Sequence, residues 1–256
     1  MLLAVLASSC TAGSVTVAFV DPRPIDEAIQ KLESEYGWPI TYEEPPWVFG
    51  GDLIDVTAQV RRDGKSASEP GIKQILVPRS LSLFVELEER LRQEPGTRAP
   101  EAEARAAIQA VLKSYSGLVG GVEMFTLTDS DGVFHIIPTL RKNEAGRLER
   151  AAPVLDMLVD IPPGERTFYE LVIAVCQSVS SQTGYRIDGA PNTSPSGNRN
   201  ALRTAIASRP GESARSILSR VFAEFAMPQP VSWSLLHESG WGYALNVRVV
   251  NTSVRP

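Results

Sequence analysis

The stretch VDPRPIDEAIQKLESEYGWPITYEEP, residues 20–45, predicts a short strand, a helix and a second strand. Apolar residues recur at the spacing of one helix face in Ile25, Ala28, Ile29, Leu32 and Tyr36. Pro24 suits the first turn of this helix, and Gly37 suits its end. The segment PITYE, residues 39–43, follows and predicts a strand. The stretch is therefore typical of a β-α-β unit.

The same pattern returns in the second half of the chain. The five apolar positions recur 147 residues later, with one polar substitution, as Val172, Val175, Cys176, Val179 and Thr183. Six positions of a further helix recur 110 residues later: Ala104, Ala107, Ile108, Val111, Leu112 and Tyr115 correspond to Ala214, Ile217, Leu218, Val221, Phe222 and Phe225. Constant differences of this kind indicate an internal repeat. The first copy holds 37 more residues between its helices, and we expect its polar segments at 61–71 and 92–104 to be solvated loops.

Strand patterns surround these helices in both copies. Each second helix leads into a hairpin pattern of alternating apolar and polar residues, at residues 122–138 and 231–250. One strand is expected before each first helix and another before each second helix, at residues 15–21, 155–162, 74–87 and 201–208. The last of these segments is also compatible with a helix.

We therefore predict an α+β protein with the order β-α-β-β-α-β-β occurring twice. Each module would be a small mixed sheet with two helices packed on one face, because each helix has a single apolar stripe. The predicted organisation is a signal region, a first module with long inserted loops, a charged linker, a second module and a tail, at residues 1–13, 14–140, 141–152, 153–251 and 252–256. About eleven helix side chains, each contributing roughly 1.5–3 kcal/mol when buried, would give each copy its own core.

The composition is that of a folded protein without a nucleic-acid surface. The chain has 256 residues, of which 43% are hydrophobic and 21% are charged. Its formal net charge of −5 and the absence of a basic stripe argue against nucleic-acid binding, which needs clustered cations. No apolar run is long enough to predict a transmembrane helix.

The first ten residues, MLLAVLASSC, predict export from the cytoplasm. Their short apolar run, which ends in small residues, resembles the core of a signal peptide, although the usual basic start is missing. An ordinary first strand is the alternative. Residues 7–10 also resemble a lipoprotein signal in which Cys10 would carry a lipid, although Ala7 departs from the preferred leucine. The expected location is the periplasm or, through a lipid anchor, the outer membrane.

The sequence offers few groups for catalysis, and we expect a protein that is not an enzyme and needs no metal or cofactor. His135 and His237 are the two histidines of the chain, and both flank predicted hairpin turns, where we expect partly exposed strand residues. Neither a zinc-binding HExxH string nor a GxSxG nucleophile motif occurs. Cys176 lies on an apolar helix face and is expected to be buried.

The segment YEEPPWVFGGD, residues 42–52, is the strongest candidate for a binding site. It places three acidic and two aromatic side chains close together: Glu43, Glu44, Trp47, Phe49 and Asp52. Such a set offers stacking and hydrogen bonding to a sugar or a peptide. The alternative is a strand end followed by a loop that Trp47 anchors in the core.

Both halves resemble the short N-terminal domain of secretins and TonB-dependent receptors, the STN domain. The resemblance is carried by residues 20–45 and 159–191, with a strand, a proline-containing turn and a helix that ends at glycine, and by the later helix and hairpin at 211–236. It implies a periplasmic domain that binds partner proteins. The first helix of the second copy is about one turn longer than the family helix. Two departures limit what the resemblance implies: we expect no barrel or pore segment after the second copy, and the first copy has a long insertion. Receptor signalling or secretion-pore assembly is therefore not carried over.

The sequence therefore favours a non-enzymatic protein-interaction module of a bacterial envelope assembly. Its edge strands and the loop between strand and second helix would meet the partner. A small-ligand or glycan-binding protein that uses residues 42–52 is the alternative, and a hydrolase of unrecognised type is the second alternative.

Overall fold

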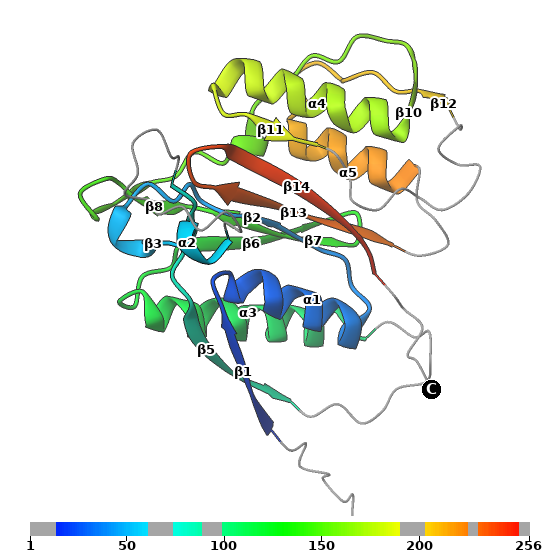
Figure 1. Ribbon diagram of the computed structural model, residues 1–256. Coiled ribbons are helices and arrows are strands. Elements are labelled where there is room, and N and C mark those ends of the chain that lie inside the picture. Colours follow the sequence, from blue (N-terminus) through cyan, green and yellow to red (C-terminus); the bar gives the residue numbers. More distant parts are fainter. Residues whose placement is uncertain (1–13, 61–73, 89–98, 190–202, 225–229, 251–256) are drawn as a thin grey trace, which may run out of the picture.

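A computed structural model describes residues 14–60, 74–88, 99–189, 203–224 and 230–250. Within them the protein is mixed α+β, with two helix pairs and one central sheet between them (Figure 1). The predicted signal region, Cys10, Phe225 and the predicted tail lie outside the described residues. We refer below to residues 14–138 as the first half and to residues 153–250 as the second half.

The first half forms the elements that its apolar patterns predict. In chain order they are β1 (Ser14–Asp21), α1 (Pro24–Tyr36), β2 (Ile40–Glu43), β5 (Leu81–Glu88), α3 (Glu101–Leu118), β6 (Phe125–Ser130) and β7 (Val133–Pro138). Pro24 occupies the first turn of α1, where its missing N–H leaves no helical hydrogen bond unmade. Gly37 ends the helix with φ of 67°, a left-handed conformation that glycine adopts without strain.

The second half repeats this order, with its first three strands shorter and its last two longer than those of the first half. Its elements are β10 (Glu165–Thr167), α4 (Phe168–Thr183), β11 (Ile187–Asp188), β12 (Arg203–Ala205), α5 (Ala214–Glu224), β13 (Val231–Glu238) and β14 (Gly242–Val249). The prediction of an opening strand at 155–162 was wrong, because the strand is β10. The apolar residues of that segment instead pack against α4 and α5, partly as the short 3-10 helix η2 (Val154–Asp156).

Additional short elements connect these units. The insertion of the first half contains the 3-10 helix η1 (Gly50–Asp52), β3 (Leu53–Asp55), α2 (Thr57–Val60) and β4 (Leu76–Pro78). The segment 141–152, expected as a linker, overlaps a hairpin of β8 (Leu140–Lys142) and β9 (Leu148–Arg150).

The central sheet has six strands in the order β11-β14-β13-β2-β7-β6. The sequence predicted a separate sheet for each module, whereas the structure joins strands of both halves through a parallel pairing of β13 with β2. All four residues of β2 are buried, which explains why this strand needs a neighbour on each side. Helices α1 and α3 cover one face of the sheet, and α4 and α5 cover the other (Figure 1).

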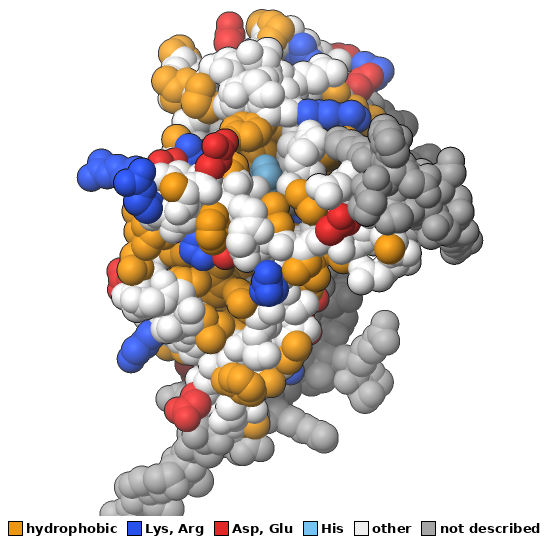
Figure 2. Space-filling model, turned by 60° about the vertical axis from the view of Figure 1, so that its left-hand side comes forward, with side chains coloured by type: hydrophobic (Ala, Val, Ile, Leu, Met, Phe, Trp, Pro, Cys, Tyr) orange, Lys and Arg blue, Asp and Glu red, His pale blue; other side chains and the backbone are white. Residues whose placement is uncertain are grey.

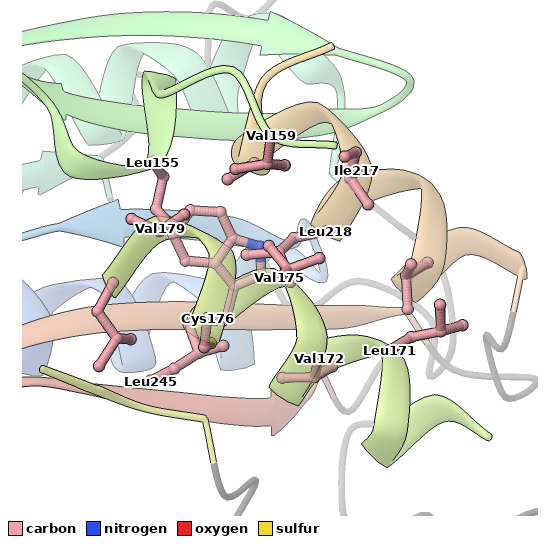
Figure 3. Close-up of a cluster of buried hydrophobic side chains, with 14 of the residues drawn as sticks. Leu155, Val159, Leu171, Val172, Val175, Cys176, Val179, Ile217, Leu218 and Leu245 are labelled. Carbon is pink, nitrogen blue, oxygen red and sulfur yellow. The ribbon is translucent and has the colours of Figure 1, made fainter. Parts of the chain in front are cut away.

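Each helix pair also packs against a two-stranded antiparallel sheet, which is β1 with β5 in the first half and β10 with β12 in the second. Two separate hydrophobic cores result. In the core of the second half, side chains of α4 meet those of α5 and β14, and Cys176 lies buried among them (Figure 3). The other core holds the apolar faces of α1, α3, β2 and β7. Each half therefore supplies most of the core under its own helices, and Leu236 of β13 adds one side chain to the core of the first half.

Candidate functional site

Charged side chains surround the contact of β2 with β13, which we call the central joint. Glu43 at the end of β2 accepts hydrogen bonds from the Arg215 guanidinium and from the backbone N–H of Val154. Arg215 also contacts Asp156, with 2.8 Å between Nε and Oδ1. Burial raises the pKa of Glu43, and Arg215 opposes that shift by stabilising the charged form. Glu43 is thus the partner of a buried arginine of the other half.

Glu44 belongs to the same joint. Its Oε2 accepts from Arg23 Nε at 3.1 Å and from the backbone N–H of His237 at 2.8 Å. Arg23 also donates to the carbonyl oxygen of His237 and pairs with Glu238, so it too links the halves. Burial raises the pKa of Glu44 to about 7, against the opposing effects of Arg23 and of the neighbouring Trp47 indole.

A third arginine completes the joint. Arg248 of β14 pairs with Asp26 at 3.0 Å and with Glu33 at 3.1 Å, both on α1. Glu33 in turn accepts from the backbone N–H of Ile40, the first residue of β2. Three arginines and six acidic side chains therefore fix the register in which the two halves meet.

Both histidines are buried at this joint, which corrects the prediction of partly exposed positions. His135 lies between the hydroxyls of Thr41, 2.7 Å from Nδ1, and Ser130, 2.9 Å from Nε2. His237 accepts the backbone N–H of Trp47 at Nδ1. Burial lowers the pKa of each histidine to about 4. His135 is on β7 of the first half and lies close enough to the second half to be influenced by the charges of Arg215 and Asp156. His237 packs against Tyr185 and Tyr243 of its own half and meets the Trp47 backbone of the first half.

A cavity of about 340 Å³ lies beside the central joint. Its walls come from the loop after β2, the turn between β4 and β5, the end of α3 and strand β8. The lining residues are Pro45, Pro46, Trp47, Val48, Phe49, Asp52, Arg79, Leu81, Tyr115, Leu118, Val119, Met124 and Lys142. Most of these side chains are apolar, and the charged ones come from three different segments.

The loop that forms one wall is held by the joint. The backbone N–H of Glu44 donates to the carbonyl of Leu235, and that of Trp47 donates to His237. The Phe49 ring fills the space over Gly146 in the β8–β9 turn, where an added Cβ would come within 2.9 Å of the ring. A larger residue would have to displace the ring, and φ of 75° also favours glycine at this position.

The charged side chains of the cavity carry more positive than negative charge. Lys142 Nζ lies 2.8 Å from Asp52 Oδ1 and 5.6 Å from the centre of the Phe49 ring. Arg79 is exposed, and no ion pair of its guanidinium occurs among the described residues. Figure 2 shows hydrophobic side chains gathered on this side of the molecule, with Lys or Arg side chains beside them.

The structure divides the five candidate residues of the sequence analysis into two groups. Trp47, Phe49 and Asp52 line the cavity, whereas Glu43 and Glu44 are each 1% exposed and belong to the central joint. The cavity also uses residues that sequence reasoning did not select, such as Arg79, Tyr115 and Lys142. Tyr115 was predicted only as a core residue of its helix, and no local pattern marks the other two.

Other observations bear on the chemistry of the chain. Cys176 is buried, and burial raises the pKa of its thiol to about 12. Within the described ranges, no three His, Cys, Asp or Glu side chains are close enough to hold a metal ion. In the same part of the chain, no helix is both long and apolar enough to cross a membrane.

Comparison of this chain with protein-family models, with curated proteins and with solved structures found no match.

Proposed function

We propose that this chain is a non-enzymatic protein-interaction module of a bacterial cell envelope, and that it binds its partner at the cavity beside the central joint. The observation that carries this proposal is the cavity itself. It is lined mainly by apolar side chains, and one of its walls is held in place by hydrogen bonds from the second half. A preformed apolar recess with a few charged groups is typical of a binding site.

The proposal includes a duplicated, STN-like unit. In the first half β1 pairs with β5, β2 runs parallel to β7, and β7 pairs with β6. In the second half β10 pairs with β12, β11 runs parallel to β14, and β14 pairs with β13. The strand directions agree pair by pair, as expected for two copies of one module. This agreement supports a scaffold of the kind that the STN resemblance implies.

Export to the periplasm, with or without a lipid on Cys10, is part of the proposal. It rests on the signal-like sequence of residues 1–10. A protein at this location would meet partners in the cell envelope.

A small-ligand or glycan-binding protein is the second candidate. It is favoured by the two aromatic side chains, Trp47 and Phe49, that line the cavity. The cavity volume lies near the lower end of the range for ligand pockets, which suits one inserted side chain better than an extended polysaccharide.

Capture from envelope extracts tests the choice between these candidates. The bait proteins are the wild type, Leu118→Glu at the cavity and, as a matched control, Leu158→Glu in the second half. Both leucines are exposed, to 47% and 59%, so neither change disturbs a core. We expect the wild type and the control to retain the same protein and Leu118→Glu to lose it. Equal capture by all three, or retention only on a glycan column that Trp47→Ala abolishes, would contradict the proposal.

A further inference from the structure

We propose that the cavity beside the central joint receives an apolar side chain that stands next to a carboxylate on the partner protein. This inference rests on the proposed function and names the chemistry of the partner at the same site. It follows from three features: the apolar wall, the charge at the cavity and the volume.

The apolar wall requires an apolar group. Leu81, Val119 and Met124 contribute aliphatic surface, and Leu118 is exposed to 47% although it is a large apolar residue. Val48 on the opposite loop is 36% exposed. Removing such side chains from water favours association, because apolar surface is more stable in contact with an apolar group than with water. A polar ligand would leave this contribution unused.

The charge at the cavity requires an anionic neighbour. Lys142 and Arg79 supply two positive charges, and Asp52 supplies one negative charge. Since Asp52 already pairs with Lys142, the Arg79 guanidinium is the group that lacks an acidic partner among the described residues. A carboxylate on the partner would pair with Arg79 in two parallel hydrogen bonds, a geometry that guanidinium favours. A cationic ligand would meet net repulsion.

The positive charge at the cavity contrasts with the net charge of the whole chain. Its formal net charge is −5, so an excess of cations at the cavity is opposite in sign to the average surface. Long-range attraction of acidic partners is therefore weak, and recognition depends on contact within the cavity. The volume of about 340 Å³ limits the occupant to one side chain and its neighbouring group.

Two small probes test the inference on the full chain. N-acetyl-L-leucine carries an apolar side chain beside a carboxylate, and N-acetyl-L-leucinamide is its uncharged counterpart. Binding is followed by NMR through the indole N–H signal of Trp47, assigned with Trp47→Phe. We expect a Kd on the order of a few mM for the acid, from the limited size of the probe. The amide should bind about 3–5-fold more weakly, as expected for a partly exposed ion pair.

Variants at the cavity make the test specific. Arg79→Gln should abolish the preference for the acid while the Kd of the amide stays unchanged. Arg209→Gln, which removes an exposed arginine of the second half, should leave the preference intact. Equal affinity for acid and amide, an Arg79→Gln variant that keeps the preference, or no signal shift by either probe at about 20 mM, several times the expected Kd, would overturn the inference. Loss of partner capture by Leu118→Glu would still support the proposed function in each of these cases.

Discussion

The buried ion pair between Glu43 and Arg215 should account for a large part of the stability of the central joint. The perturbation is Glu43→Gln, which keeps the side-chain volume and removes the charge. The amide oxygen of the substituted side chain would still accept the Val154 N–H. Its NH₂ group, however, would replace the oxygen that accepts from Arg215, so two hydrogen-bond donors would face each other. A hydrogen bond to a charged group contributes about 1.5–3 kcal/mol, and Asp156 continues to compensate part of the arginine charge. We expect a loss of about 2–4 kcal/mol in the free energy of unfolding.

The complementary change, Arg215→Met, leaves the Glu43 carboxyl buried without its cation. Breaking a buried pair in this way costs about 3–5 kcal/mol. The double variant should lose less than the sum of the single losses, by at least about 1.5 kcal/mol, because neither unpaired group then remains. Urea unfolding at pH 7 of the wild type, both single variants and the double variant measures this coupling.

A control for the same experiment is Asp156→Asn. The Asp156 side chain is 47% exposed, so its pair with Arg215 should contribute less than about 1 kcal/mol. The reasoning is refuted if the losses from Glu43→Gln and Arg215→Met add within about 0.5 kcal/mol, since independent sites behave in that way. A loss from Glu43→Gln no larger than that from Asp156→Asn would refute it as well.

Three further predictions address the site, the pH dependence and the N-terminus. Gly146→Ala should cost about 1–2 kcal/mol in thermal unfolding and shift the Phe49 ring signals, because of the positive φ and the close ring; an unchanged Tm would contradict this. The pKa of His135, lowered by burial to about 4, lies below the unfolded value near 6.5, so the unfolded chain binds the extra proton between these values and the contribution of neutral His135 rises with pH across that window. The unfolding free-energy difference between the wild type and His135→Gln should therefore shrink by roughly 2–3 kcal/mol from pH 7 to pH 4.5, and a pH-independent difference would show that the histidine is not buried in its neutral form. Mass spectrometry of the protein from the native membrane should find Cys10 as a lipid-bearing N-terminus, and an unmodified Cys10 would exclude the anchor.

The helices were predictable because their signals are local. Pro24 and Gly37 mark the ends of α1, and Gly184 ends α4 with φ of 75°. The hairpins were predictable for the same reason, since strand alternation and turn residues lie within a few positions. The opening strand of the second half was misplaced because an apolar segment that packs on helices has the same composition as one that pairs in a sheet.

The central joint was not predictable from local patterns. The pairing of Tyr42 with Ser234 joins residues far apart in sequence. No residue pattern within β2 or β13 indicates that these two strands pair with each other. Two adjacent glutamates such as Glu43 and Glu44 are typical of an exposed acidic loop. Their burial is possible because Arg215 and Arg23 pair with them and offset the cost of removing their charges from water. The cavity escaped prediction in the same way, because Arg79, Tyr115 and Lys142 converge from three segments.

The segment 42–52 therefore has two structural tasks, and the first controls the second. Glu43 and Glu44 hold the halves together, whereas Trp47, Phe49 and Asp52 form a wall of the cavity a few residues later. The Trp47 N–H bonds to His237 of the second half, so the wall has its shape only when the halves are docked. A partner that fills the cavity would bind the docked form in preference to the separated one, and its binding free energy would add to the stability of the joint.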